Sequence, residues 1–500
     1  DLEPVNSTSA PTPTQIVPTD PRSIAVLPFA NMSPDPANAY LADGMAEELL
    51  NVLSRIDGLK VASRTSAFSF RDEAVGVREI GQRLSVAHVV DGSVRRQGDQ
   101  VRVAAQLVST IDDRQLWSGS FNRQADDLFA LQEEIAQAIT NALIEPLGVR
   151  TVEVRQATDD PQAYELYLRG RQLFAQRGAS LMPARELLQR SVDRDPRFAE
   201  AWAVLAAIEY VLPSYFSEVQ TQNARTAAAE AATRALALVP NEPSALAVSA
   251  RLAADQGQRT RAIDLADRAL AEDPNNANTL MWKGLTLLEA GQINAARQAF
   301  DLARRLDPLS GIHLGWLAST EVVDGEFERA AKHLAEAHAL GWQGPATAWQ
   351  LKLTLNQHGF GAEAEQAFRR WIAADGRIDP AALPAYRDVA PAFGDPALAE
   401  QAEATIIEHI EQHPQLDWSP LLINLGRTDA ALAELLRPKP PSRHIVLMMI
   451  WTAVDKPLRD HPDFTRVARN AGLIEFWQQH GGPDHCRLIS EIAEKLACQR

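Results

Sequence analysis

The chain has 500 residues, of which 46% are hydrophobic, enough for several domains with substantial buried cores. Its 49 Lys and Arg residues are outnumbered by 65 Asp and Glu residues, which gives a formal net charge of −16. Such a charge repels nucleic-acid backbones and anionic lipids, so we expect no nucleic-acid partner for this chain. The longest apolar stretch, residues 445–454, is shorter than the roughly 18 apolar residues that a membrane span needs.

Residues 1–22 are rich in Pro, Ser and Thr and contain few large apolar residues. This composition predicts a flexible, extended linker. Because the linker stands at the very start and no Met precedes it, we expect the sequence to be part of a longer protein. Upstream residues would then hold any membrane anchor and effector domain.

Residues 23–150 show the pattern of an α/β domain with a mixed sheet. SIAVLPFA at 23–30 predicts a buried strand, and residues 45–56 place apolar side chains at helical spacing. A second strand at 59–64 and a short helix at 77–85 follow. Residues 87–110 hold two alternating runs around the turn QGDQ, which is a hairpin signal. With a third alternating strand and a closing helix, the predicted order is β-α-β-α-β-β-β-α.

The same domain carries a set of ordered short motifs: SIAVLPFANMSPDP, YLADGMAEELLNVLSRI, LKVASRTSAFSF, AHVVDGSVRRQGDQVRVAAQLV and LWSGSFNR. Together they resemble the module similar to the amino-terminal domain of TolB that occurs in bacterial signalling proteins. These proteins include membrane-anchored winged-helix transcription regulators of the CadC type, class III adenylate cyclases and some serine/threonine kinases. The resemblance implies that the module follows an effector domain and a membrane segment and precedes tetratricopeptide repeats.

The strand–loop–helix segment at 23–61 also has the outline of a nucleotide site, but its chemistry argues against one. A phosphate-binding loop needs closely spaced glycines and usually a Lys, whereas PFANMSPDPANAYLADG has one Gly and no Lys. Asp35, Asp43, Glu47 and Glu48 crowd the region with negative charge. We therefore expect these carboxylates to cap helices and complement helix dipoles.

From residue 160 a helical repeat begins. Pro240, Pro274 and Pro308 are 34 residues apart, which is the tetratricopeptide period. The frame that they set predicts tetratricopeptide repeats over 160–345, with an insertion, LPSYFSEVQTQN, looping between two helices. Small residues recur where two antiparallel helices must approach closely, and the positions one period apart are Ala262, Ala296 and Ala330.

Beyond the repeats the pattern decays. Residues 346–440 predict degenerate helical repeats, and residues 441–500 predict a C-terminal helical cap that covers the end of the solenoid. The chain is therefore expected to be an α/β domain followed by an all-α, tetratricopeptide-like solenoid.

The last segment contains both cysteines of the chain, Cys486 and Cys498. HPDFTRVARNAGLIEFWQQHGGPDHC resembles the closing segment of the same signalling proteins. Two interpretations stay open for the cysteines: a disulfide, which forms outside the cytosol, or two unrelated thiols. His480, Asp484 and His485 add zinc-type donors beside Cys486, but their spacing matches no common structural zinc pattern, and we predict no metal.

The first helix of each repeat lines the concave face of such a solenoid. Tyr and Arg side chains set among small residues there could hold an extended peptide or a short helix, although solvated side chains would show the same pattern. The predicted partner-binding groove consists of Tyr164, Tyr167, Arg171, Tyr210, Arg251, Asn278 and Met281.

No nucleophile motif, metal set or nucleotide loop is visible in the sequence, so we predict a non-catalytic chain without a cofactor. The resemblance implies the sensor and protein-interaction region of a membrane-anchored regulator in the periplasm. The alternatives are the C-terminal region of a class III adenylate cyclase, or a stand-alone repeat scaffold, with a cytoplasmic location. A membrane contact is expected only through a missing upstream anchor. The ligand or partner, the effector and the choice between monomer and homodimer stay open.

Overall fold

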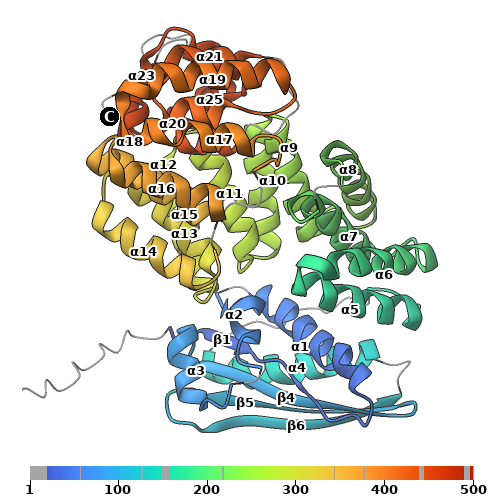
Figure 1. Cartoon of the computed structure of the whole chain (residues 1–500). Coiled ribbons are helices and arrows are strands. Elements are labelled where there is room, and N and C mark those ends of the chain that lie inside the picture. Colours follow the sequence, from blue (N-terminus) through green and yellow to red (C-terminus); the bar gives the residue numbers. More distant parts are fainter. Residues whose placement is uncertain are drawn as a thin grey trace, which may run out of the picture.

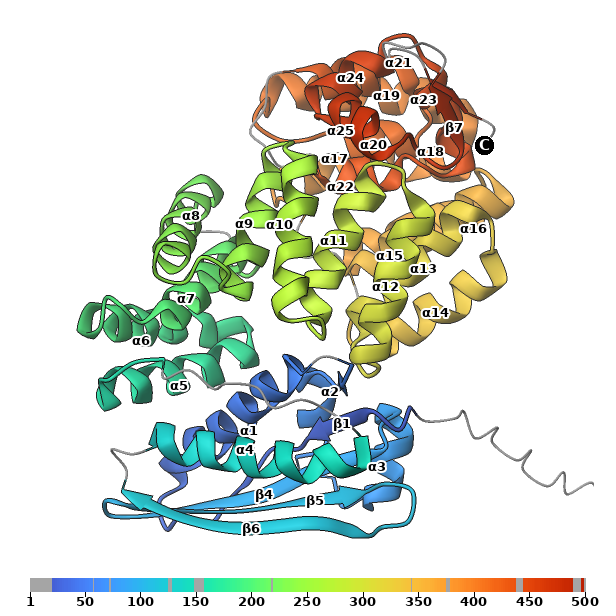
Figure 2. The same cartoon turned by 180° about the vertical axis from the view of Figure 1, so that it is seen from behind.

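The computed structural model describes residues 20–56, 58–71, 73–124, 128–147, 157–216, 219–342, 344–374, 378–437, 444–488 and 496–498. Most of the predicted linker, residues 1–19, lies outside the described residues. The rest forms an α/β domain, a curved helical solenoid and a C-terminal module (Figure 1). The view from behind shows the α/β domain and the C-terminal module on opposite sides of the middle repeats (Figure 2).

The sheet of the α/β domain is mixed, as predicted. Among the described residues, five strands run in the order β3-β1-β4-β5-β6, and a sixth, short β2, pairs with β4. β1 is parallel to β3 and β4, whereas β4, β5 and β6 are antiparallel. The strands are β1 (Ser23–Val26), β2 (Ala30–Asn31), β3 (Lys60–Val61), β4 (His88–Gln97), β5 (Gln100–Ser109) and β6 (Gln115–Gln124).

Helices cover both faces of β1, which explains its unbroken apolar sequence. Ile24 and Val26 belong to the core under α1 (Ala39–Ser54) and α4 (Leu128–Leu147). Ala25 and Leu27 belong to a smaller core with α2 (Arg64–Phe68) and α3 (Val77–Leu84). α1 and α4 lie on the side of the sheet that faces the solenoid (Figures 1 and 2). The predicted element order is confirmed, with β2 and α2 as additions too short to predict.

The solenoid consists of antiparallel helix pairs. These pairs follow the 34-residue period of the sequence. Ala262, Ala296 and Ala330, which recur on that period, are at most 2% exposed at the helix crossings, as predicted. The helices are too close at Gly284 for a larger side chain, because a Cβ there would lie 2.5 Å from the Phe300 ring. The helices of the regular repeats are α5 (Pro161–Gln176), α6 (Leu181–Arg194), α7 (Ala199–Val211), α8 (Thr221–Leu238), α9 (Pro243–Asp255), α10 (Arg259–Glu272), α11 (Ala277–Glu289), α12 (Ile293–Leu306), α13 (Gly311–Asp324) and α14 (Phe327–Ala339).

The less regular part continues the same superhelix. The predicted insertion, residues 212–223, follows α7 and begins with a 3-10 turn, Leu212–Ser214, but its last three residues belong to α8 and not to a loop. The later helices are α15 (Gly344–His358), α16 (Ala362–Ala374), α17 (Leu383–Val389), α18 (Pro391–Gly394), α19 (Ala399–Gln412), α20 (Ser419–Asn424) and α21 (Thr428–Leu436). Within the described part of the chain, no helix combines the length and apolarity needed to cross a membrane.

The C-terminal module differs from the predicted helical cap in two ways. It is helical through α22 (His444–Met449), α23 (Lys456–Asp460), α24 (Phe464–Asn470) and α25 (Leu473–His480), and then forms a two-stranded sheet of β7 (Cys486–Leu488) and β8 (Leu496–Cys498). It also folds back onto the turns inside the middle repeats. Trp477 donates its Nε1 hydrogen to Ala290 O at 2.8 Å, and Pro483 and Trp451 close over Gly291.

Candidate functional site

The α/β domain docks on the first repeat through α1 and α5. Tyr164 and Tyr167 are buried in this contact, and the Tyr167 ring packs 4.7 Å from the Phe198 ring, centroid to centroid. Leu168 packs against Gly44 of α1, where a Cβ would approach its side chain to 2.9 Å. This part of the predicted partner groove is therefore occupied by the chain's own α/β domain, which corrects its assignment as an open groove.

Arg171 lies at the centre of the same contact. Its Nη2 is 2.6 Å from Glu47 Oε1, its Nη1 pairs with Glu48, and its Nη1 also donates to the Tyr167 hydroxyl at 2.9 Å. Burial alone would raise the pKa of Glu47, but the charges of Arg171 and Arg64 outweigh burial and hold that pKa below its usual range. Glu47 and Glu48 are thus inter-domain anions and not the helix caps that the sequence suggested.

Two loops between repeats bind the α/β domain farther along the solenoid. Asn275 donates from Nδ2 to Ser54 O and Leu59 O, both at 2.9 Å, and accepts from Val61 N at 3.1 Å. All three bonds involve strand and helix ends whose backbone groups have no partner inside their own element. Asn275 therefore links the solenoid to the sheet.

Asp307 makes the second of these links. It accepts from the backbone N and the hydroxyl of Ser66, at 3.1 and 2.6 Å, and lies 3.3 Å from His313 Nε2. Burial opposes its ionisation, but the bonds from His313 and the serines lower the pKa of Asp307. The contact of α5 with α1 and these two loops together hold the α/β domain against one edge of the solenoid.

A cavity of about 340 Å³ lies inside this junction. Its walls come from α1, the loop before α2, α5, α7 and the starts of α9 and α11. Of the predicted groove, Tyr164, Tyr167, Arg171 and Asn278 line it. The charged lining residues are Glu47, Glu48, Arg55, Arg64, Arg171, Arg177, Glu200, Glu242, Asp273 and Asp307.

Arg177 has an unusual backbone at the edge of this cavity. It follows α5 with φ 60° and ψ −166°, a region that is essentially restricted to glycine. Holding another residue there costs on the order of 1–3 kcal/mol, so the surrounding structure must impose it. Its guanidinium stacks on Phe174, 4.0 Å from the ring centroid.

Two carboxylates on the solenoid side of the cavity have raised pKa values. Burial, together with the nearby charge of Glu200, raises the pKa of Glu242 to about 7. Burial likewise raises the pKa of Glu200, and the charge of Glu48 adds to the shift. Glu242 caps α9 by accepting from Ala245 N at 2.5 Å. These acids therefore face the cavity with part of their charge uncompensated.

Three of the predicted groove residues do not face an open surface. Arg251 is buried between Tyr210, which accepts from its Nε at 3.1 Å, and Glu289 at 3.4 Å. Met281 is 6% exposed in the core between repeats. The prediction that Tyr210, Arg251 and Met281 line a groove is wrong, because all three residues are buried. Asn278 alone of the seven is exposed.

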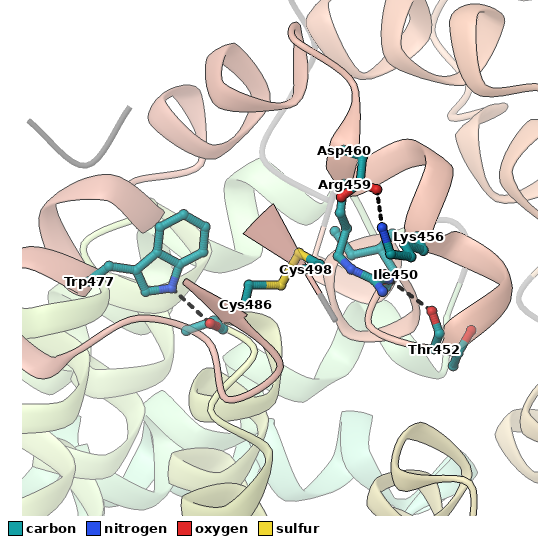
Figure 3. The surroundings of a disulfide bond; sticks show 9 residues. Ile450, Thr452, Lys456, Arg459, Asp460, Trp477, Cys486 and Cys498 are labelled. Atoms are coloured by element: carbon teal, nitrogen blue, oxygen red, sulfur yellow. Dashed lines mark hydrogen bonds and ion pairs between the residues drawn. A yellow bond between two sulfur atoms is a disulfide. The ribbon is translucent and has the colours of Figure 1, made fainter. Parts of the chain in front are cut away.

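The cysteine pair lies at the other edge of the solenoid. Cys486 and Cys498 face each other across the β7–β8 pair and are joined as a disulfide, with a Cα–Cα distance of 3.9 Å. Trp477 lies on one side of the bridge and Arg459 on the other (Figure 3). The sequence analysis predicted the pair in a helical segment, whereas the structure places Cys486 in β7 and Cys498 in β8.

The zinc-type donors beside Cys486 serve the fold. His485 Nε2 lies 2.7 Å from Asp324, at the end of α13, and Asp484 accepts from Asn294 N at 2.8 Å. Across the residues that the structure describes, no group of three or more His, Cys, Asp or Glu side chains is arranged to hold a metal ion.

Comparison with known proteins defines the class of each part. Residues 20–138 match the family model of the HilA/YgeH-like transcriptional regulator, second domain. Residues 217–277 and 253–313 match tetratricopeptide repeat models. The chain therefore combines a regulator-like α/β domain with tetratricopeptide repeats, and the resemblance to TolB stays a prediction.

One curated relative is "Putative adenylate cyclase 3" of Rhizobium meliloti (strain 1021), 39% identical over 209 residues. The match covers 41% of this chain and 35% of that protein, so the chain spans about a third of the relative's length. Among solved structures, PilF of Pseudomonas aeruginosa is 16% identical, with a TM-score of 0.33 over 42% of this chain and 90% of its own. A tetratricopeptide protein of Parabacteroides merdae is 15% identical, with a TM-score of 0.37 over 55% and 100%.

Proposed function

We propose that this chain is the non-catalytic sensor and protein-interaction region of a membrane-anchored bacterial signalling protein, in which a winged-helix effector domain lies outside these residues. The supporting observation is the combination of a domain similar to that of HilA/YgeH-like transcriptional regulators with tetratricopeptide repeats, a solenoid type that commonly binds proteins. TolB-like modules in this arrangement would serve as the connection between effector and repeats.

The fold offers a physical route for such a signal. The α/β domain meets the solenoid through ion pairs and hydrogen bonds at α5, Asn275 and Asp307. A partner bound to the repeats could favour one docking geometry, and the α/β domain would pass that preference to the residues before Asp20. Control of transcription would belong to the effector and not to these residues.

A second candidate function has its own support. The 39% identity to a protein named as an adenylate cyclase favours a cyclase as the attached effector. In that case the same region would regulate nucleotide cyclisation. Both candidates assign the same non-catalytic role to this chain and differ only in the effector.

The full-length natural protein separates the two. Produced in a cyclase-deficient bacterium, it should leave cyclic AMP at background and retain a specific promoter fragment if the effector is a winged helix. Accumulation of cyclic AMP without promoter binding would support the cyclase instead. Purified residues 1–500 should show neither activity, and cyclase, kinase or duplex-DNA binding by them alone would contradict the non-catalytic role.

The proposed periplasmic location is tested separately. Alkaline phosphatase, fused after Arg500 of the full-length protein, is active only when it is exported, whereas β-galactosidase at the same position is active only in the cytoplasm. We expect phosphatase activity. Active β-galactosidase with inactive phosphatase would favour the cytoplasmic alternative.

A further inference from the structure

The junction cavity contains a cation that the domain contact does not use. Arg171 is satisfied by Glu47 and Glu48, but Nη1 of Arg177 is buried and has no hydrogen-bond partner among the described residues. Burial and the nearby charge of Arg64 lower the pKa of Arg177. A buried guanidinium nitrogen without an acceptor is costly, and native structures seldom keep one without a reason.

The surroundings of Arg177 form a positive, aromatic wall. Arg177 stacks on Phe174, and Arg64 stacks on Phe68 at 4.3 Å from the ring centroid, with its Nε 3.1 Å from Glu47. Arg64, Phe174 and Arg177 all line the cavity. A planar anion fits such a wall because guanidinium groups bind carboxylates through parallel hydrogen bonds.

The acidic part of the lining limits the charge that the occupant can carry. Glu200 and Glu242 line the cavity together with Asp273 and Asp307, and these carboxylates would repel a second negative group. A volume of about 340 Å³ lies at the small end of the range for small-molecule sites. The occupant is thus small, has one anionic end and presents neutral or donor groups to the two glutamates.

We infer that the cavity between the α/β domain and the first repeats binds a small organic carboxylate, whose carboxylate group pairs with Arg177 and Arg64. This inference rests on the proposed sensor function, for which it supplies the class of ligand. Because the walls belong to both domains, a bound carboxylate would stabilise their docked arrangement.

The test uses acetate as the minimal carboxylate and chloride at equal ionic strength as the reference. We expect acetate to raise the melting temperature of purified wild-type chain by roughly 2 °C or more over chloride, since a ligand of the folded state stabilises it. Arg177→Met keeps the contact with Phe174 and should lose that response. Arg177→Lys keeps the charge and should retain part of it, and Arg190→Met, on the exposed side of α6, should respond as wild type does.

A second measurement does not depend on the probe. In chloride, Arg177→Met should melt at or above the temperature of the wild type, because it removes a guanidinium nitrogen that is buried without an acceptor. Equal acetate responses of wild type and Arg177→Met, or a lower melting temperature of Arg177→Met in chloride, would overturn the inference. Both results concern binding by the purified chain, so they leave the effector and export experiments on the full-length protein to decide the proposed function.

Discussion

Replacing Arg171 with Met tests the domain junction at its centre. The side chains of Arg171 and Glu47 are each 11% exposed, and that of Glu48 is 15% exposed, so little solvent screens the three charges. Met retains most of the aliphatic packing but removes the cation that Glu47 and Glu48 share, although Glu47 keeps its ion pair with Arg64. Loss of one partner from a buried ion pair costs about 3–5 kcal/mol, and we expect a loss of that size in the free energy of unfolding.

Differential scanning calorimetry can measure this loss and assign it to a domain. Arg190→Met, the same exchange on the exposed side of α6, should change the free energy of unfolding by no more than about 0.5 kcal/mol. Adding Glu47→Gln and Glu48→Gln to Arg171→Met should recover much of the loss, because it removes the two negative charges that Arg171 balanced. A loss below about 1 kcal/mol for Arg171→Met, or a triple variant no more stable than the single one, would refute the reasoning.

Three further predictions concern the repeats, the bridge and pH. Ala296→Leu should overpack the crossing of α11 and α12 and lower the free energy of unfolding by about 1–3 kcal/mol, measured by thermal unfolding. Gln298→Leu, on the exposed side of α12, should cause no such loss. Equal melting temperatures of the two variants would count against the repeat frame. Exported protein should show no free thiol under denaturing conditions, and two titratable thiols would contradict the bridge. Cys486→Ser should lower the free energy of unfolding by at least about 1 kcal/mol, within the roughly 3 kcal/mol expected for a loop of this size. The folded-state pKa of Glu242 is raised from 4.5 to about 7, so the folded chain binds this proton more tightly than the unfolded one, and stability should fall as pH rises through that window. The loss is about 3 kcal/mol for a shift of this size. Glu242→Gln should flatten the pH dependence of the melting temperature between these values, and an unchanged slope would argue against a buried, uncompensated carboxylate.

Much of the fold could be predicted because its signals are local. The alternation on both sides of the QGDQ turn specifies the β4–β5 hairpin, and the 34-residue period specifies the crossings at Ala262, Ala296 and Ala330. β2 has two residues, too short for any periodicity, and depends on pairing with β4. β3 lies within the strand predicted at 59–64, but only Lys60–Val61 pair with β1.

Less of the site could be predicted from the sequence, because it arises from contacts between distant segments. Tyr167 and Arg171 were singled out for their chemistry, but only the docked α/β domain shows that Glu47 and Glu48 are their partners. Asn275 and Asp307 were missed. Each stands next to one of the repeat-ending prolines, Pro274 and Pro308, and this recurring position beside the inter-repeat turn was the available signal.

The C-terminal module illustrates the same limit. Its helices were predictable from apolar spacing, but its packing on two turns inside the repeats was not: Ala471 lies against Gly257, and Pro483 lies against Gly291. Gly291 has φ +74°, and a Cβ there would lie 2.6 Å from Pro483. A glycine at a turn inside a repeat has a sufficient local explanation, so the sequence gives no sign that a distant segment packs on it.

Amide hydrogen exchange of wild type and Arg171→Met tests the central claim, that the α/β domain is fixed on the first repeats and is not joined to them by a free linker. Exchange followed by mass spectrometry reports separately on α1 (Ala39–Ser54), α5 (Pro161–Gln176) and α12 (Ile293–Leu306). The account predicts that α1 and α5 lose protection together in Arg171→Met while α12 keeps its own. Unchanged protection of α1 and α5 in the variant, or loss in only one of them, would contradict it.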